Sequence, residues 1–135
     1  MRRFLAIAIV PFVVVACQAG VVPPEQMKLD VSNETTIPVR LVVNGAPVVA
    51  IAAGDALELD SDQLPALPWD AQVLTVSGRM LVHLRVNAGD VFARENASGG
   101  DAARVDLSCG RIDLWSGPPL LGPAPGPGNP GDCDP

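Results

Sequence analysis

The chain has little of what long helices and nucleic-acid surfaces are built from. Among its 135 residues there are one lysine, no tyrosine, one histidine and three cysteines. Nine basic residues stand against 15 acidic ones, and because phosphates attract a basic surface, this balance argues against a nucleic-acid partner. The 14 prolines and 13 glycines disfavour long helices and favour short strands joined by tight turns.

The one long apolar run lies at the N-terminus. Arg2 and Arg3 precede an uncharged run from Phe4 to Val15, which is the pattern of an export signal. Twelve helical residues reach only about 18 Å, whereas a transmembrane helix has to cross about 30 Å of hydrocarbon. We therefore predict export, with a run too short to serve as a membrane-spanning anchor.

The run ends in Val14-Val15-Ala16-Cys17, which resembles the lipobox of bacterial lipoproteins, with Val14 where that family usually has leucine. The resemblance implies that residues 1–16 are removed as the signal peptide and that Cys17, diacylated on sulfur, becomes the N-terminus. This lipid would hold the protein at the cell membrane or outer surface of a bacterium, on the extracytoplasmic side. The alternative is an ordinary signal cut near Ala19, which would release a soluble protein.

Lipidation of Cys17 would leave Cys109 and Cys133 as an even pair in an oxidising compartment, so we expect them to be bonded. The bond would close a loop of about 24 residues, worth about 3 kcal/mol in the chain-entropy picture. It would strap the tail rich in proline and glycine, residues 116–135, across the domain. Loss of two arginines with the signal leaves 7 basic against 15 acidic residues, a net charge of −8, which disfavours an anionic membrane surface as a direct partner.

Residues 17–27, which include Pro23-Pro24, are predicted to be an extended tether, and the strands are expected within residues 28–115. The first strand is predicted at Lys28–Ser32. Asn44-Gly45 has the sequence of a type I′ turn and predicts a hairpin over Thr36–Ile51. A two-residue loop sets three apolar pairs across this hairpin: Val43 with Ala46, Leu41 with Val48, and Val39 with Ala50. Pro38 and Pro47 place at least one of its strands at a sheet edge.

A second hairpin is predicted over Ala71–Val76 and Arg79–Val86, on either side of Ser77-Gly78. Its expected apolar pairs are Val73 with Val82, Thr75 with Met80, and Ala71 with Leu84. In Arg104–Trp115 the alternation slips by one residue at Gly110, which predicts a β-bulge or a turn. With a short strand at Ala56–Leu59, these segments predict one antiparallel β-sandwich of immunoglobulin-like architecture, with about seven strands over residues 28–115.

Few residues are candidates for chemistry. His83 would lie on a polar face with Gln72, Arg79 and Arg85, where we expect it to be solvated rather than catalytic. A solvated strand edge, with weak calcium binding as the alternative, is expected for the acids Asp55, Glu58, Asp60 and Asp62. Trp69 and Trp115 are possible ligand-contact aromatics, although both would also suit the core. We expect no catalytic residue, no cofactor and no metal.

These observations predict a non-enzymatic lipoprotein of the cell envelope, a binding or structural module whose partner would be an envelope polymer or protein. The alternative is a small hydrolase that acts on envelope polysaccharide or peptide through Asp and Glu residues, because sandwiches host both functions. Two carboxylates converging in a cleft, one of them with a raised pKa, would favour the hydrolase. A convex surface would favour the binding module.

Overall fold

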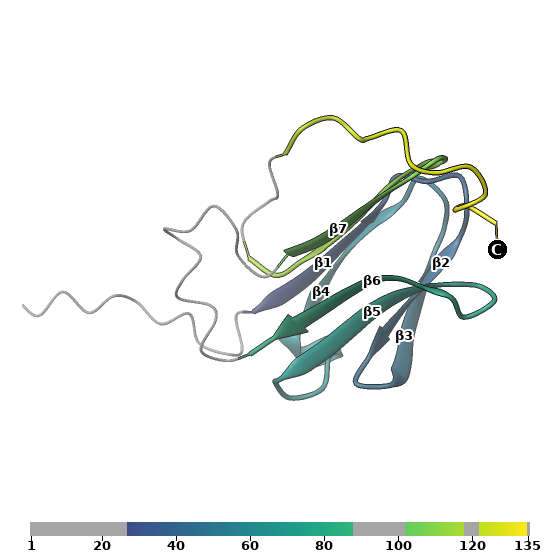
Figure 1. The fold of residues 1–135 in the computed structure, drawn as a ribbon. Coiled ribbons are helices and arrows are strands. Elements are labelled where there is room, and N and C mark those ends of the chain that lie inside the picture. Colours follow the sequence, from purple (N-terminus) through teal and green to yellow (C-terminus); the bar gives the residue numbers. More distant parts are fainter. Residues whose placement is uncertain (1–26, 88–101, 118–121, 135) are drawn as a thin grey trace, which may run out of the picture.

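The computed structural model describes residues 27–87, 102–117 and 122–134, in which two four-stranded antiparallel sheets pack face to face (Figure 1). The first sheet has the order β4 (Ala56–Asp60), β1 (Lys28–Asn33), β8 (Gly110–Trp115) and β7 (Ala102–Leu107). The second has the order β3 (Ala46–Ile51), β2 (Val39–Val43), β5 (Trp69–Thr75) and β6 (Met80–Val86). A short 3-10 helix, η2 (Ser61–Gln63), follows β4.

The predicted fold class is confirmed, since the protein is an all-β sandwich. The described residues form eight strands where about seven were predicted, because Arg104–Trp115 turns back at Ser108-Cys109 and forms the hairpin β7–β8. The predicted signal peptide, its helix and its lipobox lie outside the described residues. Within the described ranges, no helix has the length and apolar character needed to cross a membrane.

Alternate residues of the strands build one core between the two sheets. Leu29 and Val31 of β1 are fully buried, as are Ile112 and Leu114 on the neighbouring strand β8. The facing sheet contributes fully buried residues of β2 and β5: Val39, Leu41, Val43, Ala71 and Val73. Because a slip of one residue would turn every one of these side chains to solvent, their burial sets the register of the strands.

The first hairpin forms as predicted at its turn and differs farther along. Asn44 (φ 53°) and Gly45 (φ 77°) have the positive φ angles that a type I′ turn requires, and the first pair below them is the predicted one. The next pair, Val42 with Pro47, keeps this register, and from Leu41 onward the predicted register is wrong. A β-bulge shifts the strands by one residue, so that Leu41 lies opposite Val49, and Val39 lies opposite Ile51. The extra residue turns Ile51 into the core in place of the smaller Ala50, which is exposed.

The placement of this hairpin confirms the prediction of an edge strand. β3 is the outermost strand of the second sheet, and it carries Pro47, which has no N–H to donate. β2, its partner, is an inner strand that pairs on its other side with β5.

The second hairpin has the predicted pairs of Val73 with Val82 and Ala71 with Leu84. The predicted pairing of Thr75 with Met80 is wrong, since Leu74 lies opposite Met80 after a register shift. Thr75 instead closes the turn, because its N–H donates to the carbonyl of Arg79 at 2.9 Å and its hydroxyl accepts the N–H of Arg79 at 3.0 Å.

The antiparallel order sorts the loops to two ends of the sandwich (Figure 1). The end at which β1 begins also holds the Asn44-Gly45 turn, the start of β5 and the end of β6. Because the tether leads into β1, this end is named the tether end. The opposite end, named the clasp end, holds the turns that follow β5 and β7 and the loops at residues 34–38 and 52–55.

Asn33, at the clasp end, is a fully buried polar residue that holds two loops together. Its amide nitrogen donates to the carbonyls of Ile37 and Ala52, both at 2.9 Å. Its amide oxygen accepts the Thr35 hydroxyl at 2.6 Å. Since a buried polar group is stable only when its hydrogen bonds are made, this side chain fixes where both loops lie.

Candidate functional site

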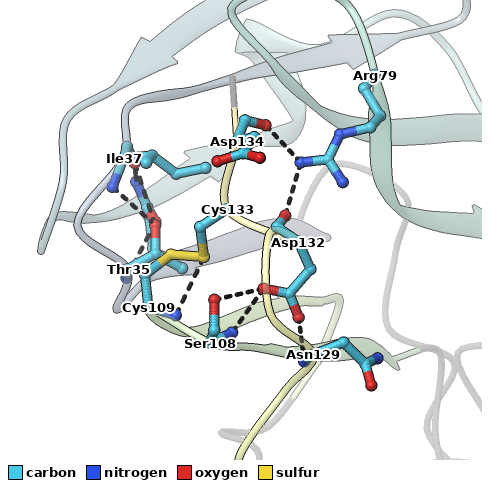
Figure 2. The surroundings of a disulfide bond; sticks show 10 residues. Thr35, Ile37, Arg79, Ser108, Cys109, Asn129, Asp132, Cys133 and Asp134 are labelled. Atoms are coloured by element: carbon cyan, nitrogen blue, oxygen red, sulfur yellow. Dashed lines mark hydrogen bonds between the residues drawn. A yellow bond between two sulfur atoms is a disulfide. The ribbon is translucent and has the colours of Figure 1, made fainter.

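The C-terminal segment 122–134, here called the strap, crosses the outer face of the β7–β8 hairpin (Figure 1). Near its end Cys133 is bonded to Cys109 of the β7–β8 turn, and the two Cα atoms are 6.1 Å apart (Figure 2). Both cysteines are half-buried and pack against the core. The predicted disulfide is therefore present in the structure.

Asp132 holds the strap beside the disulfide (Figure 2). Its carboxylate accepts the Ser108 hydroxyl at 2.6 Å, the Ser108 N–H at 2.8 Å and the Asn129 N–H at 2.6 Å. These hydrogen bonds, with the Ser108 hydroxyl the largest contributor, lower the pKa of the Asp132 carboxyl and so favour its charged form.

A second contact joins the strap to the other sheet. Arg79, in the turn between β5 and β6, donates to the backbone carbonyls of Asp132 at 2.6 Å and of Asp134 at 2.7 Å (Figure 2). The strap is thus bonded covalently to the first sheet and by charge-assisted hydrogen bonds to the second. It closes the clasp end across both layers of the sandwich.

Two cross-strand ion pairs lie beneath the strap. Arg104 of β7 pairs with Asp113 of β8, and Arg111 of β8 pairs with Asp106 of β7 at 2.7 Å. Arg111 also donates to the carbonyl of Pro123 in the strap at 2.6 Å. The Arg111 guanidinium, with a smaller contribution from a strap N–H, lowers the pKa of the Asp106 carboxyl. The strap is therefore seated on a charged surface whose charges are internally balanced.

Glycine and proline alternate in the strap for a geometric reason. A Cβ atom on Gly128 would overlap the backbone of Leu107, and one on Gly126 would crowd the Asp106 side chain. The intervening Pro123, Pro125 and Pro127 are exposed. Glycine backbone thus packs against β7 while the prolines face solvent and restrict the chain, which lowers the entropy lost on docking.

Apart from the strap, the structure has a shallow depression at the tether end that could hold a ligand, with a volume of about 310 Å³. It lies between the β2–β3 turn, the loop before β5 and the end of β6, and it is lined by Asn44, Ala66, Pro68, Asp70 and Arg85. Asn44 fixes its rim, because its side chain accepts the Asp70 N–H at 2.8 Å and donates to the Pro68 carbonyl at 3.2 Å.

His83 is exposed on the polar face, in keeping with the predicted solvated position, but an acidic partner that was not predicted lies beside it. Its Nε2 is 3.1 Å from Oδ1 of Asp70, and Gln72 donates to the same oxygen at 3.1 Å. Asp70 was not identified from the sequence as a partner of His83, because β5 was predicted to start at Ala71, whereas it starts at Trp69. Extending the alternation of β5 back by two residues would have placed Asp70 on the same face as Gln72.

The two tryptophans have different positions. Trp69 is 1% exposed, and its indole N–H donates to the Pro65 carbonyl at 2.7 Å, so it has no face for a ligand and the ligand-contact prediction is wrong for it. Trp115 is half-buried and lies across from Asp30 of β1. Trp115 therefore stays a candidate.

The predicted acidic edge is largely solvated. Glu58 and Asp60 of β4 form ion pairs with Lys28, while Asp55 and Asp62 are exposed. Within the described ranges, no three His, Cys, Asp or Glu side chains gather closely enough to hold a metal ion. No known protein family, curated protein or solved structure was found to match the chain.

Asp30 has the most unusual environment of the acids on the outer face of the first sheet. It lies opposite Glu58 on β4. Burial raises the pKa of Asp30 to about 6, with a smaller contribution from the charge of Glu58. Two neighbouring carboxylates, one with a raised pKa, meet part of the criterion for a hydrolase. Both carboxylates lie on a sheet face, however, and the carboxylate of Glu58 is already ion-paired with Lys28.

Proposed function

We propose that the protein is a lipid-anchored protein of the bacterial cell envelope, held to the membrane at Cys17. The observation that carries the proposal is the pairing of the cysteines. With Cys109 bonded to Cys133, Cys17 is the one cysteine of three that is left for a lipid. A disulfide also suits an oxidising, extracytoplasmic compartment and would be unusual in a reducing one.

We propose further that the sandwich is a non-enzymatic binding or structural module for an envelope polymer or protein. The clasped strap supports this, since a domain that is closed covalently and across both sheets gives a rigid body on which a binding surface can be preformed. The hydrolase alternative rests on Asp30 and Glu58. Release of soluble fragments from purified envelope by the protein, lost in Asp30→Asn, would favour the hydrolase.

The anchoring proposal is tested by growing the producing bacterium with a labelled fatty acid. Label is expected in the wild-type protein, which should sediment with membranes, and no label is expected in Cys17→Ser. The double variant Cys109→Ser/Cys133→Ser is the matched control, because it also replaces cysteines by serine and should still carry the label. Equal labelling of the wild type and Cys17→Ser, or no label in either, would overturn the proposal.

A further inference from the structure

The depression at the tether end contains two opposite charges that do not neutralise each other. Asp70 and Arg85 are directly opposed across β5 and β6. In the first sheet, charges opposed in the same way close ion pairs: Arg104 with Asp113, and Asp106 with Arg111. Asp70 pairs with His83 instead, and within the described part of the chain the guanidinium of Arg85 has no partner.

The position of Asp70 is fixed before any ligand arrives. Gln72 and His83 both contact its Oδ1 atom, and no contact within the described ranges uses its Oδ2 atom. Its backbone is held by Asn44 on both sides, since each residue donates its N–H to an oxygen of the other, at 2.8 Å and 2.9 Å. A preformed acceptor and an unpaired guanidinium therefore line the same small depression, which reduces the entropy that binding would cost.

We propose that this depression binds the phosphoethanolamine headgroup of a membrane lipid, with the phosphate on Arg85 and the ammonium on Oδ2 of Asp70. A guanidinium offers a phosphate two parallel N–H donors, and a carboxylate accepts strongly from a primary ammonium. The volume of about 310 Å³ suits a headgroup rather than a polymer. A headgroup with both charges is neutral overall, so the net charge of −8 of the mature chain does not repel it.

The position of the depression favours a lipid over a free solute. It lies at the end of the sandwich at which β1 begins, and Met27, just before that strand, is ten positions along the chain from Cys17. A fully extended chain of this length spans about 35 Å, so a lipid on Cys17 would keep this end close to the headgroups. This choice of ligand rests on the proposed lipid anchor.

The charge pairing is tested with soluble phosphoethanolamine added to the detergent-purified full chain, followed by calorimetry. Saturable binding is expected, with the affinity at least about tenfold lower in Arg85→Gln and in Asp70→Asn, because each removes one charge-assisted contact. Arg40→Gln is the matched control and should bind normally, since Arg40 is bonded to the Val76 carbonyl elsewhere on the sheet. Phosphocholine, whose methylated ammonium cannot donate to Asp70, should bind at least about tenfold more weakly.

The lipid source is tested with the acylated full chain in vesicles. Mass spectrometry would measure how fast an arginine-specific dicarbonyl reagent modifies Arg85, with Arg40 as the internal standard. Protection of Arg85 is expected in vesicles that contain phosphatidylethanolamine and not in vesicles of phosphatidylcholine alone. Equal modification in both vesicles, or equal affinity for glycine and phosphoethanolamine, would overturn the inference. Either result would leave the fatty-acid labelling of Cys17 unaffected, so the two proposals fail separately.

Discussion

Gly128 of the strap lies so close to the backbone of Leu107 that no side chain could be accommodated between them. Its φ angle of 62° is also one that residues with a side chain rarely adopt. Besides the hydrogen bonds that hold the strap, two of its features can be tested separately: the disulfide at its end and this close approach of backbone to β7. Their separate contributions can be measured.

Gly128→Ala should undock the strap while the disulfide stays intact. The added methyl group would overlap the Leu107 backbone, and we expect docking to weaken by about 1–3 kcal/mol. The measurement is the rate at which a protease of broad specificity cleaves the strap in the unreduced protein. Gly131→Ala is the matched control, because it has a similar φ of 82° but would make only an ordinary contact at 3.4 Å. Equal cleavage of the two variants would contradict the contact.

Removing the disulfide should release the strap first and destabilise the rest of the domain moderately. Cys109 and Cys133 are 24 residues apart, and a bond over this separation stabilises the folded state by about 3 kcal/mol because it restricts the unfolded chain. Denaturant unfolding of the double variant Cys109→Ser/Cys133→Ser, and proteolysis with and without reductant, measure the two effects. Two free thiols in the exported, unreduced protein, or a strap cleaved equally fast in both conditions, would contradict this.

Asn33→Ala should be among the most destabilising single changes at the clasp end. It would remove from the fully buried Asn33 side chain the donor to the carbonyls of Ile37 and Ala52 and the acceptor of the Thr35 hydroxyl, at a cost of about 2–4 kcal/mol. Asn129→Ala is the control, because Asn129 is exposed and contributes a backbone N–H rather than its side chain. Similar midpoints of urea unfolding for the two variants would rule out the role given to Asn33.

Asp30→Asn should stabilise the protein at neutral pH and have little effect in acid. The pKa of Asp30 is raised from 3.8 to about 6, so the unfolded chain loses this proton first as the pH rises. The stability that the neutral carboxyl contributes is complete below 3.8 and is lost as the pH rises through about 6. Because part of the carboxyl contacts solvent, we expect a loss of only about 1 kcal/mol. Unfolding measured from about pH 4 to about pH 7 tests this, and a constant difference between the two proteins would contradict it.

Local signals in the sequence were sufficient to predict the fold class and the turn at Asn44-Gly45. Asn44-Gly45 specifies its turn through backbone angles alone, and the alternation in β2 and β5 assigns their buried faces. The bulge in β3 could not be predicted, because Val48 and Val49 are both apolar and either could face inward. Only the packing of Ile51 against the other sheet selects the observed register.

The candidate sites depend on contacts between segments that the sequence does not order. The pairing of Cys109 with Cys133 could be predicted by counting, because three cysteines less one lipidated cysteine leave a single possible bond. The pairing of Asp70 with His83 was missed, because the prolines before Trp69 indicated a loop that would include Asp70, whereas β5 starts at Trp69. The burial of Trp69 depends on how the two sheets face each other, which no local pattern specifies.

The attachment of lipid at Cys17 is tested most directly by the intact mass of the protein extracted from membranes. The predicted mass is that of residues 17–135 with a diacylglyceryl group on Cys17 and two hydrogens fewer for the bond between Cys109 and Cys133. Fragmentation of the first peptide should place the added mass on Cys17. An unmodified chain that begins near Ala19 and is recovered from the soluble fraction would contradict the lipid anchor.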